Sequence, residues 1–91
     1  MTLEELYQII ENRKQAKPED SYVASLFKKG KDRIAKKIGE EATEVIIAAK
    51  NRRKKDIIEE VADLWFHTLI MMSSLDIKPK DILDEFERRK K

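Results

Sequence analysis

Two short acidic clusters carry the side chains best suited to chemistry. Glu41 and Glu44 are three positions apart in the first, and Glu60 and Asp63 are three positions apart in the second. Both clusters lie in stretches with helical apolar periodicity, so each pair projects from one face of its helix. If the two helices pack antiparallel, the carboxylates converge and repel one another as they lose water. Magnesium would relieve this, because it binds a few carboxylates, keeps several waters and completes its shell with phosphate oxygens.

Cationic side chains precede the first acidic cluster. Arg33 and Lys37 are four residues apart and Glu40 follows Lys37 by three, so cations and acids share one helix face within two turns. The cations would lie within reach of a phosphate held at the acids. The candidate phosphate-binding residues are Arg33, Lys36, Lys37, Lys50 and His67.

His67 admits two interpretations of equal weight. It follows Asp63 by four residues and therefore points along the acidic face, where it could contact a phosphate or orient that carboxylate. A histidine packed between helices explains the same position. Trp65, Met71 and Met72 are better explained as core or dimer interface than as a platform for a nucleotide base.

Composition excludes several classes of protein. The chain has 91 residues, with 20 basic and 18 acidic side chains and a net charge of +2, whereas a dedicated nucleic-acid binder carries a strong basic excess. The absence of cysteine excludes disulfides and thiolate zinc sites. No signal peptide or membrane span is indicated, so we expect one cytoplasmic domain over residues 1–91. A domain this short buries little surface alone, and a partner subunit would help.

The pattern of helix signals predicts an all-α fold, since only two glycines and two prolines interrupt the chain. A capping box of Thr2 and Glu5 opens a first helix that ends before Pro18. Ser21 caps a second helix, which stops at Gly30.

Three further helices follow. The third spans about residues 32–50, and a second capping box, Asp56 with Glu59, opens a fourth that runs to about residue 75. Pro79 begins a last amphipathic helix that frays from Glu87. The fourth helix is apolar on most sides and must be covered all round.

The third and fourth helices, joined by the basic turn 51–55, should form an αα-hairpin that brings the carboxylate pairs face to face. One hairpin cannot bury the fourth helix. Two chains would build a four-helix-bundle core from two hairpins and cover the surplus apolar surface, so we expect a homodimer.

The pattern EExxE followed by ExxD, with Lys37-Ile38-Gly39 before it and Asp63 to His67 closing it, resembles the phosphoribosyl-ATP pyrophosphatase family. That family belongs to the all-α, MazG-like nucleotide pyrophosphohydrolases. The similarity runs from about Leu3 to Arg89. The resemblance implies hydrolysis of 1-(5-phosphoribosyl)-ATP to phosphoribosyl-AMP and pyrophosphate, the second step of histidine biosynthesis.

The resemblance also implies residue roles. Magnesium would be bound by Glu41, Glu44, Glu60 and Asp63, and Glu40 would be a further ligand or would orient the attacking water. Two positions depart from the family pattern. The turn Arg52-Arg53-Lys54-Lys55 is more basic than usual and is left out of the site, and Val23 stands where threonine is common.

Two alternative functions fit parts of the pattern. A MazG-like enzyme that hydrolyses noncanonical or deoxynucleoside triphosphates would use the same carboxylates, although the surplus of cations before the first cluster favours a substrate with an additional ribose phosphate. A noncatalytic helical dimerisation module would keep the fold without the activity. The presence of all four carboxylates argues against that module.

Overall fold

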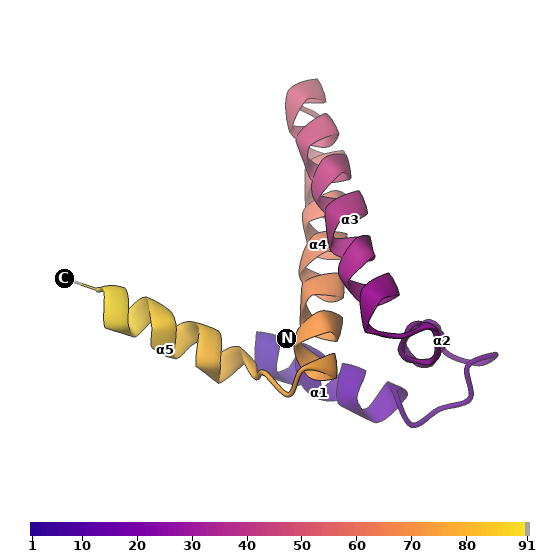
Figure 1. Cartoon of the computed structure of the whole chain (residues 1–91). Coiled ribbons are helices and arrows are strands. Elements are labelled where there is room, and N and C mark those ends of the chain that lie inside the picture. The colour runs from indigo at the N-terminus through magenta and orange to yellow at the C-terminus, as the bar shows by residue number, and fades with distance from the viewer. Residues whose placement is uncertain (91) are drawn as a thin grey trace.

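The computed structural model describes residues 1–90, and in that range the chain folds into five helices without a strand (Figure 1). The predicted all-α class is confirmed. The helices are α1 (Leu3–Arg13), α2 (Tyr22–Lys29), α3 (Lys31–Asn51), α4 (Lys54–Ser74) and α5 (Pro79–Arg89).

The two N-terminal helices begin where the capping signals predict. The Glu5 amide donates to Thr2 Oγ1 at 3.0 Å and the Thr2 amide donates to Glu5 Oε1 at 2.8 Å, which completes the capping box. Ser21 Oγ accepts from the Ala24 amide at 3.2 Å. Gly30 separates α2 from α3 with φ 102° and ψ 170°, a backbone conformation that a side chain would strain.

Helices α3 and α4 form the predicted hairpin, with a tighter turn than expected. Only Arg52 and Arg53 lie between them, and Arg52 takes a left-handed conformation with φ 59°. The predicted capping box at Asp56 is wrong, because α4 already begins at Lys54 and no side chain caps it. Asp56 lies within the first turn, where its negative charge interacts favourably with the positive end of the helix dipole.

Helix α5 begins at Pro79 as predicted, and the Lys78 amide donates to Asp81 Oδ2 at 2.9 Å. The prediction that it frays from Glu87 is wrong, since the helix continues to Arg89. Glu85 accepts hydrogen bonds from Arg88 and Arg89, which stabilise this last turn. Lys91 lies outside the described residues.

The core lies at one end of the hairpin, where α1 and α2 pack against the start of α3 and the end of α4 (Figure 1). Each of these four helices contributes a fully buried aliphatic side chain: Ile10, Val23, Ile34 and Ile70. Burial of each stabilises the fold by about 1.5–3 kcal/mol relative to an exposed side chain. Beyond this core the hairpin projects as two helices alone.

A polar cluster links α1 to the end of α4. Ser73 Oγ donates to Glu11 Oε1 at 2.6 Å, and Lys14 Nζ donates to Ser73 Oγ at 3.0 Å and lies 3.1 Å from Glu11 Oε2. Burial raises the pKa of Glu11, but the hydrogen bonds from Ser73 and Lys14 and the charge of Lys14 outweigh it, so the net pKa is lowered.

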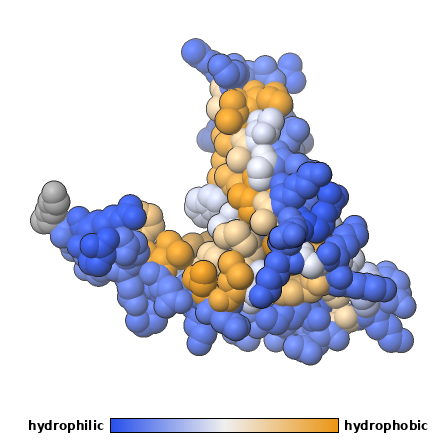
Figure 2. Space-filling model, in the orientation of Figure 1, coloured by the Kyte–Doolittle hydropathy of each residue, from blue (hydrophilic) through white to orange (hydrophobic). Residues whose placement is uncertain are grey.

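Large apolar side chains remain exposed along the hairpin and on α5, and Figure 2 shows them as a continuous apolar band on one face of the molecule. Trp65 is 54% exposed and therefore lies outside the core, whereas Met72 is buried in it. On α3, Ala48 is buried and its neighbour Ala49 is exposed. None of the helices in residues 1–90 combines the length and apolar character needed to cross a bilayer.

Candidate active site

Three predicted carboxylates meet between the long helices. Glu41 projects from α3, and Glu60 and Asp63 project from successive turns of α4. One oxygen from each lies within 4.8 Å of the others. The i,i+3 spacing gives Glu60 and Asp63 a common face, and the register of the antiparallel hairpin brings Glu41 opposite them. The three together, called the carboxylate trio below, are the type of oxygen ligand that hard divalent cations prefer.

The pKa of Glu60 shows the electrostatic state of this cluster. Partial burial raises the pKa of the Glu60 carboxyl above its ordinary value, and the negative charges of Asp63, Glu44, Glu41 and Glu59 raise it further. The folded chain therefore holds anionic groups close together without enough positive charge to balance them.

Lys37 is the cation nearest to the trio. Its Nζ lies 3.5 Å from Glu41 Oε1, one helical turn away on α3, and the two side chains are only 21% and 13% exposed. Lys37 thus neutralises part of the charge of one carboxylate from the side. Lys37 thus lies beside the acids, and its contact with a phosphate stays a prediction.

The other two acids of the first cluster lie outside the trio. Glu44 is exposed, and although its charge raises the pKa of Glu60, it is absent from the three-residue group. Glu40 is exposed as well. The structure therefore brings together three of the four predicted metal ligands, while Glu40 and Glu44 are exposed on α3 and stand outside the three-residue group.

The remaining predicted phosphate-binding cations are exposed on α3. Arg33, Lys36 and Lys50 form no ion pair within residues 1–90. Lys50 is nine residues beyond Glu41, which corresponds to about 13 Å along the helix axis. It lies toward the hairpin turn and away from the trio.

His67 is buried, with 6% of its surface exposed, and both ring nitrogens have partners within the chain. Nδ1 lies 2.7 Å from the Asp63 carbonyl oxygen, and Nε2 lies 2.6 Å from the Tyr22 hydroxyl. This arrangement supports the interpretation of a packed histidine, and its contact with phosphate stays a prediction. Sequence reasoning did not select Tyr22, because no spacing signal connects residues 45 positions apart.

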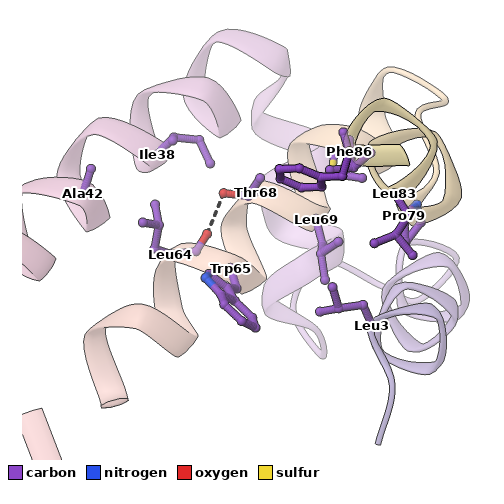
Figure 3. A pocket seen from close by; sticks show the side chains of 12 residues that line it. Leu3, Ile38, Ala42, Leu64, Trp65, Thr68, Leu69, Pro79, Leu83 and Phe86 are labelled. Atoms are coloured by element: carbon purple, nitrogen blue, oxygen red, sulfur yellow. Dashed lines mark hydrogen bonds between the residues drawn. The ribbon is translucent and has the colours of Figure 1, made fainter. Parts of the chain in front are cut away.

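An apolar groove lies elsewhere on the hairpin. A groove of about 640 Å³ runs between the hairpin, α5 and the start of α1, and it is lined by residues such as Ala42, Trp65 and Phe86 (Figure 3). No member of the carboxylate trio lines it. The groove and the trio are therefore separate features of the same hairpin.

Fold and site together define an all-α protein with a cluster of carboxylates on a helical hairpin, and carboxylate oxygens are the ligands used in metal-assisted chemistry on phosphates. A family model described as Phosphoribosyl-ATP pyrophosphohydrolase matches residues 3–90. The chain belongs to the phosphoribosyl-ATP pyrophosphohydrolase family. The resemblance inferred from the sequence and the predicted MazG-like class are thereby confirmed, and so is the predicted class of enzyme, a hydrolase of acid anhydrides.

Named relatives agree with the family match. A protein of Geobacter sulfurreducens named phosphoribosyl-ATP pyrophosphatase is 54% identical over 87 residues, which cover 96% of this chain and 81% of that protein. Proteins of the same name from Burkholderia vietnamiensis and Burkholderia multivorans are each 52% identical over 92 residues, covering 97% of this chain and 76% of theirs.

Proposed function

We propose that the carboxylate trio is the catalytic centre at which this chain hydrolyses phosphoribosyl-ATP, between the α and β phosphates, to phosphoribosyl-AMP and pyrophosphate in histidine biosynthesis. This location is supported by one observation: carboxylate oxygens of Glu41, Glu60 and Asp63, from two helices, lie within 4.8 Å of one another. Family membership supports the substrate.

The trio fits magnesium on its own chemistry. All three groups offer carboxylate oxygens, and partial burial together with the charges of the neighbouring carboxylates raises the pKa of Glu60. Glu41, Glu60 and Asp63 would hold the ion, and Glu44 is near enough for its charge to act on the same centre. When bound, magnesium supplies charge neutralisation on the phosphates and a lower pKa for a coordinated water.

The other side chains would bind and orient the reacting groups. Lys37, beside Glu41, would balance charge on the polyphosphate, and Arg33 lies one turn earlier on the same helix. Glu40 and Glu44 are exposed on α3 and can accept hydrogen bonds from a water, so Glu40 keeps the proposed task of orienting the nucleophile. A pyrophosphohydrolase in amino-acid biosynthesis also agrees with the cytoplasmic location expected from the sequence.

We also propose that the protein is a homodimer in which a second copy covers the apolar groove. Helix α5 extends away from the core (Figure 1), and the chain leaves its Ile82, Leu83 and Phe86 side chains exposed. The exposed large apolar side chains on the groove lining are Leu3, Trp65, Ile82, Leu83 and Phe86. A homodimer places two such faces against each other and completes the cover that a single hairpin lacks.

A substrate panel tests the proposed reaction. Pyrophosphate release is measured from phosphoribosyl-ATP, ATP and deoxynucleoside triphosphates, with magnesium and with a chelator. We expect turnover of phosphoribosyl-ATP alone at low enzyme concentration, and its loss with the chelator. Comparable turnover of the simple triphosphates would show a broad nucleotide pyrophosphohydrolase, and no turnover of any substrate would show a noncatalytic module.

Light scattering tests the dimer. The wild-type chain should elute with about twice the 10.7 kDa chain mass, and Trp65→Glu should shift it to the monomer, because a charge in an apolar interface is left unpaired. Lys55→Glu, an exposed change on the same helix, is the matched control and should leave the mass unchanged. A wild-type monomer would contradict the proposal.

A further inference from the structure

A chain of three groups connects α2 to the turn of α4 that carries Asp63. The Asp63 carbonyl oxygen can only accept, so His67 Nδ1 carries the proton that it donates across 2.7 Å. In the neutral ring Nε2 is then an acceptor, and the Tyr22 hydroxyl donates to it across 2.6 Å. The tautomer of His67 is fixed by the backbone of a residue in the carboxylate trio.

The His67 ring is held in place on two sides. Tyr22 packs against it with ring centroids 5.6 Å apart at 82°, and Phe66 does so at 5.7 Å and 88°. With both nitrogens engaged and the ring 6% exposed, His67 has no free donor for a ligand. Tyr22, by contrast, is 50% exposed, so its hydroxyl can be removed without opening the core.

The Tyr22–His67 hydrogen bond also links two helices. Within residues 1–90 it is the only side-chain hydrogen bond that joins α2 to α4. Helix α2 continues through Gly30 into α3, which carries Glu41. The bond therefore adds to the direct packing of α3 on α4 a second link between the Asp63 turn and the unit that supplies the opposing carboxylate.

We propose that Tyr22 and His67 are positioning residues for Asp63 in the metal site, an inference that rests on the proposed function. In this proposal they act through the backbone of α4, and His67 takes the role of orienting Asp63 in place of the predicted phosphate contact. Outer groups that orient metal ligands commonly change metal affinity by 10–100-fold when they are removed. The Tyr22 hydroxyl is separated from Asp63 by one more hydrogen bond than His67 is. Its removal is therefore expected to weaken magnesium binding by about three- to tenfold.

The test separates metal affinity from substrate affinity. Magnesium binding to the whole protein without substrate is measured by calorimetry, and the magnesium concentration for half-maximal rate and the KM at saturating magnesium are measured with phosphoribosyl-ATP. Tyr22→Phe keeps the ring and removes only the hydroxyl. We expect weaker magnesium binding by about three- to tenfold, with KM at saturating magnesium unchanged.

Tyr7→Phe is the matched control, because it removes a phenol hydroxyl in the α1–α4 contact away from the site. It should leave magnesium binding unchanged. His67→Phe should weaken magnesium binding more than Tyr22→Phe, and His67→Asn, which restores a short amide donor, should recover part of the loss.

Two results would overturn the inference alone: equal magnesium affinity in Tyr22→Phe and wild type, or a raised KM at saturating magnesium, which would make the hydroxyl a substrate contact. If the first result comes with a lower melting temperature of Tyr22→Phe, the hydroxyl has a merely structural role. A wild-type protein that binds no magnesium would overturn the proposed metal site and this inference with it.

Discussion

Two clusters of charged side chains bridge helices in the described part of the chain, and a glutamate in each has its pKa shifted in the opposite direction. Glu11 is surrounded by donors, Lys14 and Ser73, and its pKa is lowered. Glu60 is partly buried beside other carboxylates, and its pKa is raised. The first cluster is complete within the chain and joins α1 to α4. In the second, Lys37 pairs with Glu41 alone, so the three carboxylates are only partly balanced, and the proposed magnesium would supply the remaining positive charge.

The largest expected effect is a loss of turnover when a carboxylate of the trio is substituted, compared with a substitution in the Glu11 cluster. Glu41→Gln and Asp63→Asn should each lower turnover of phosphoribosyl-ATP at least about a hundredfold, because each removes a charged ligand of the proposed metal site. Circular dichroism should show unchanged helix content. Glu11→Gln removes the same charge from the other cluster and should keep near-native turnover. Near-native rates in Glu41→Gln or Asp63→Asn would contradict the proposed centre.

An intermediate effect is expected when the lysine of each cluster, Lys37 or Lys14, is substituted. Lys37→Met should raise the KM for phosphoribosyl-ATP about tenfold, since it removes a charge-assisted contact to phosphate, and should leave thermal stability nearly unchanged. Lys14→Met should do the reverse, because it leaves Glu11 without a cationic partner and removes the ammonium that lies 5.2 Å from the Phe27 ring centroid. Equal effects of both substitutions on KM would show that Lys37 has no particular part in substrate binding.

The smallest effect is the pH dependence of stability without metal. The folded-state pKa of Glu11 is lowered, so its contribution is present above the ordinary value of 4.5 and is lost as pH falls through the lowered pKa. Glu11→Gln should therefore cost about 1–2 kcal/mol at pH 7 and little in acid. The folded-state pKa of Glu60 is raised, so its repulsion acts at neutral pH and is relieved as pH falls through the raised pKa toward the ordinary value of 4.5.

Glu60→Gln should accordingly raise the melting temperature of the metal-free protein at pH 7, with the gain vanishing in acid. Thermal unfolding in a chelating buffer from pH 7 to pH 3 measures both variants. If Glu60→Gln lowers the melting temperature at pH 7, positive charge already balances the Glu60 carboxylate in the folded chain. The proposed difference between the two clusters would then be wrong.

Much of the fold was predictable because its signals are local. The Thr2–Glu5 box, the Ser21 cap and Pro79 each place a helix start through bonds or dihedral restrictions within four residues. The i,i+3 spacing likewise put Glu60 and Asp63 on one face. The predicted cap at Asp56 was wrong for a related reason: the cap signal is local, but the tight two-residue turn at Arg52 and Arg53 let α4 begin earlier.

The sequence by itself determined the helices, the acidic pairs and the hairpin that carries them, since helical periodicity and caps are properties of neighbouring residues. Only the tertiary structure decided that Glu41, rather than Glu44, meets Glu60 and Asp63, because the register between α3 and α4 depends on how their side chains pack. The same holds for Tyr22 and His67, which are 45 residues apart and meet only because the core brings α2 against α4.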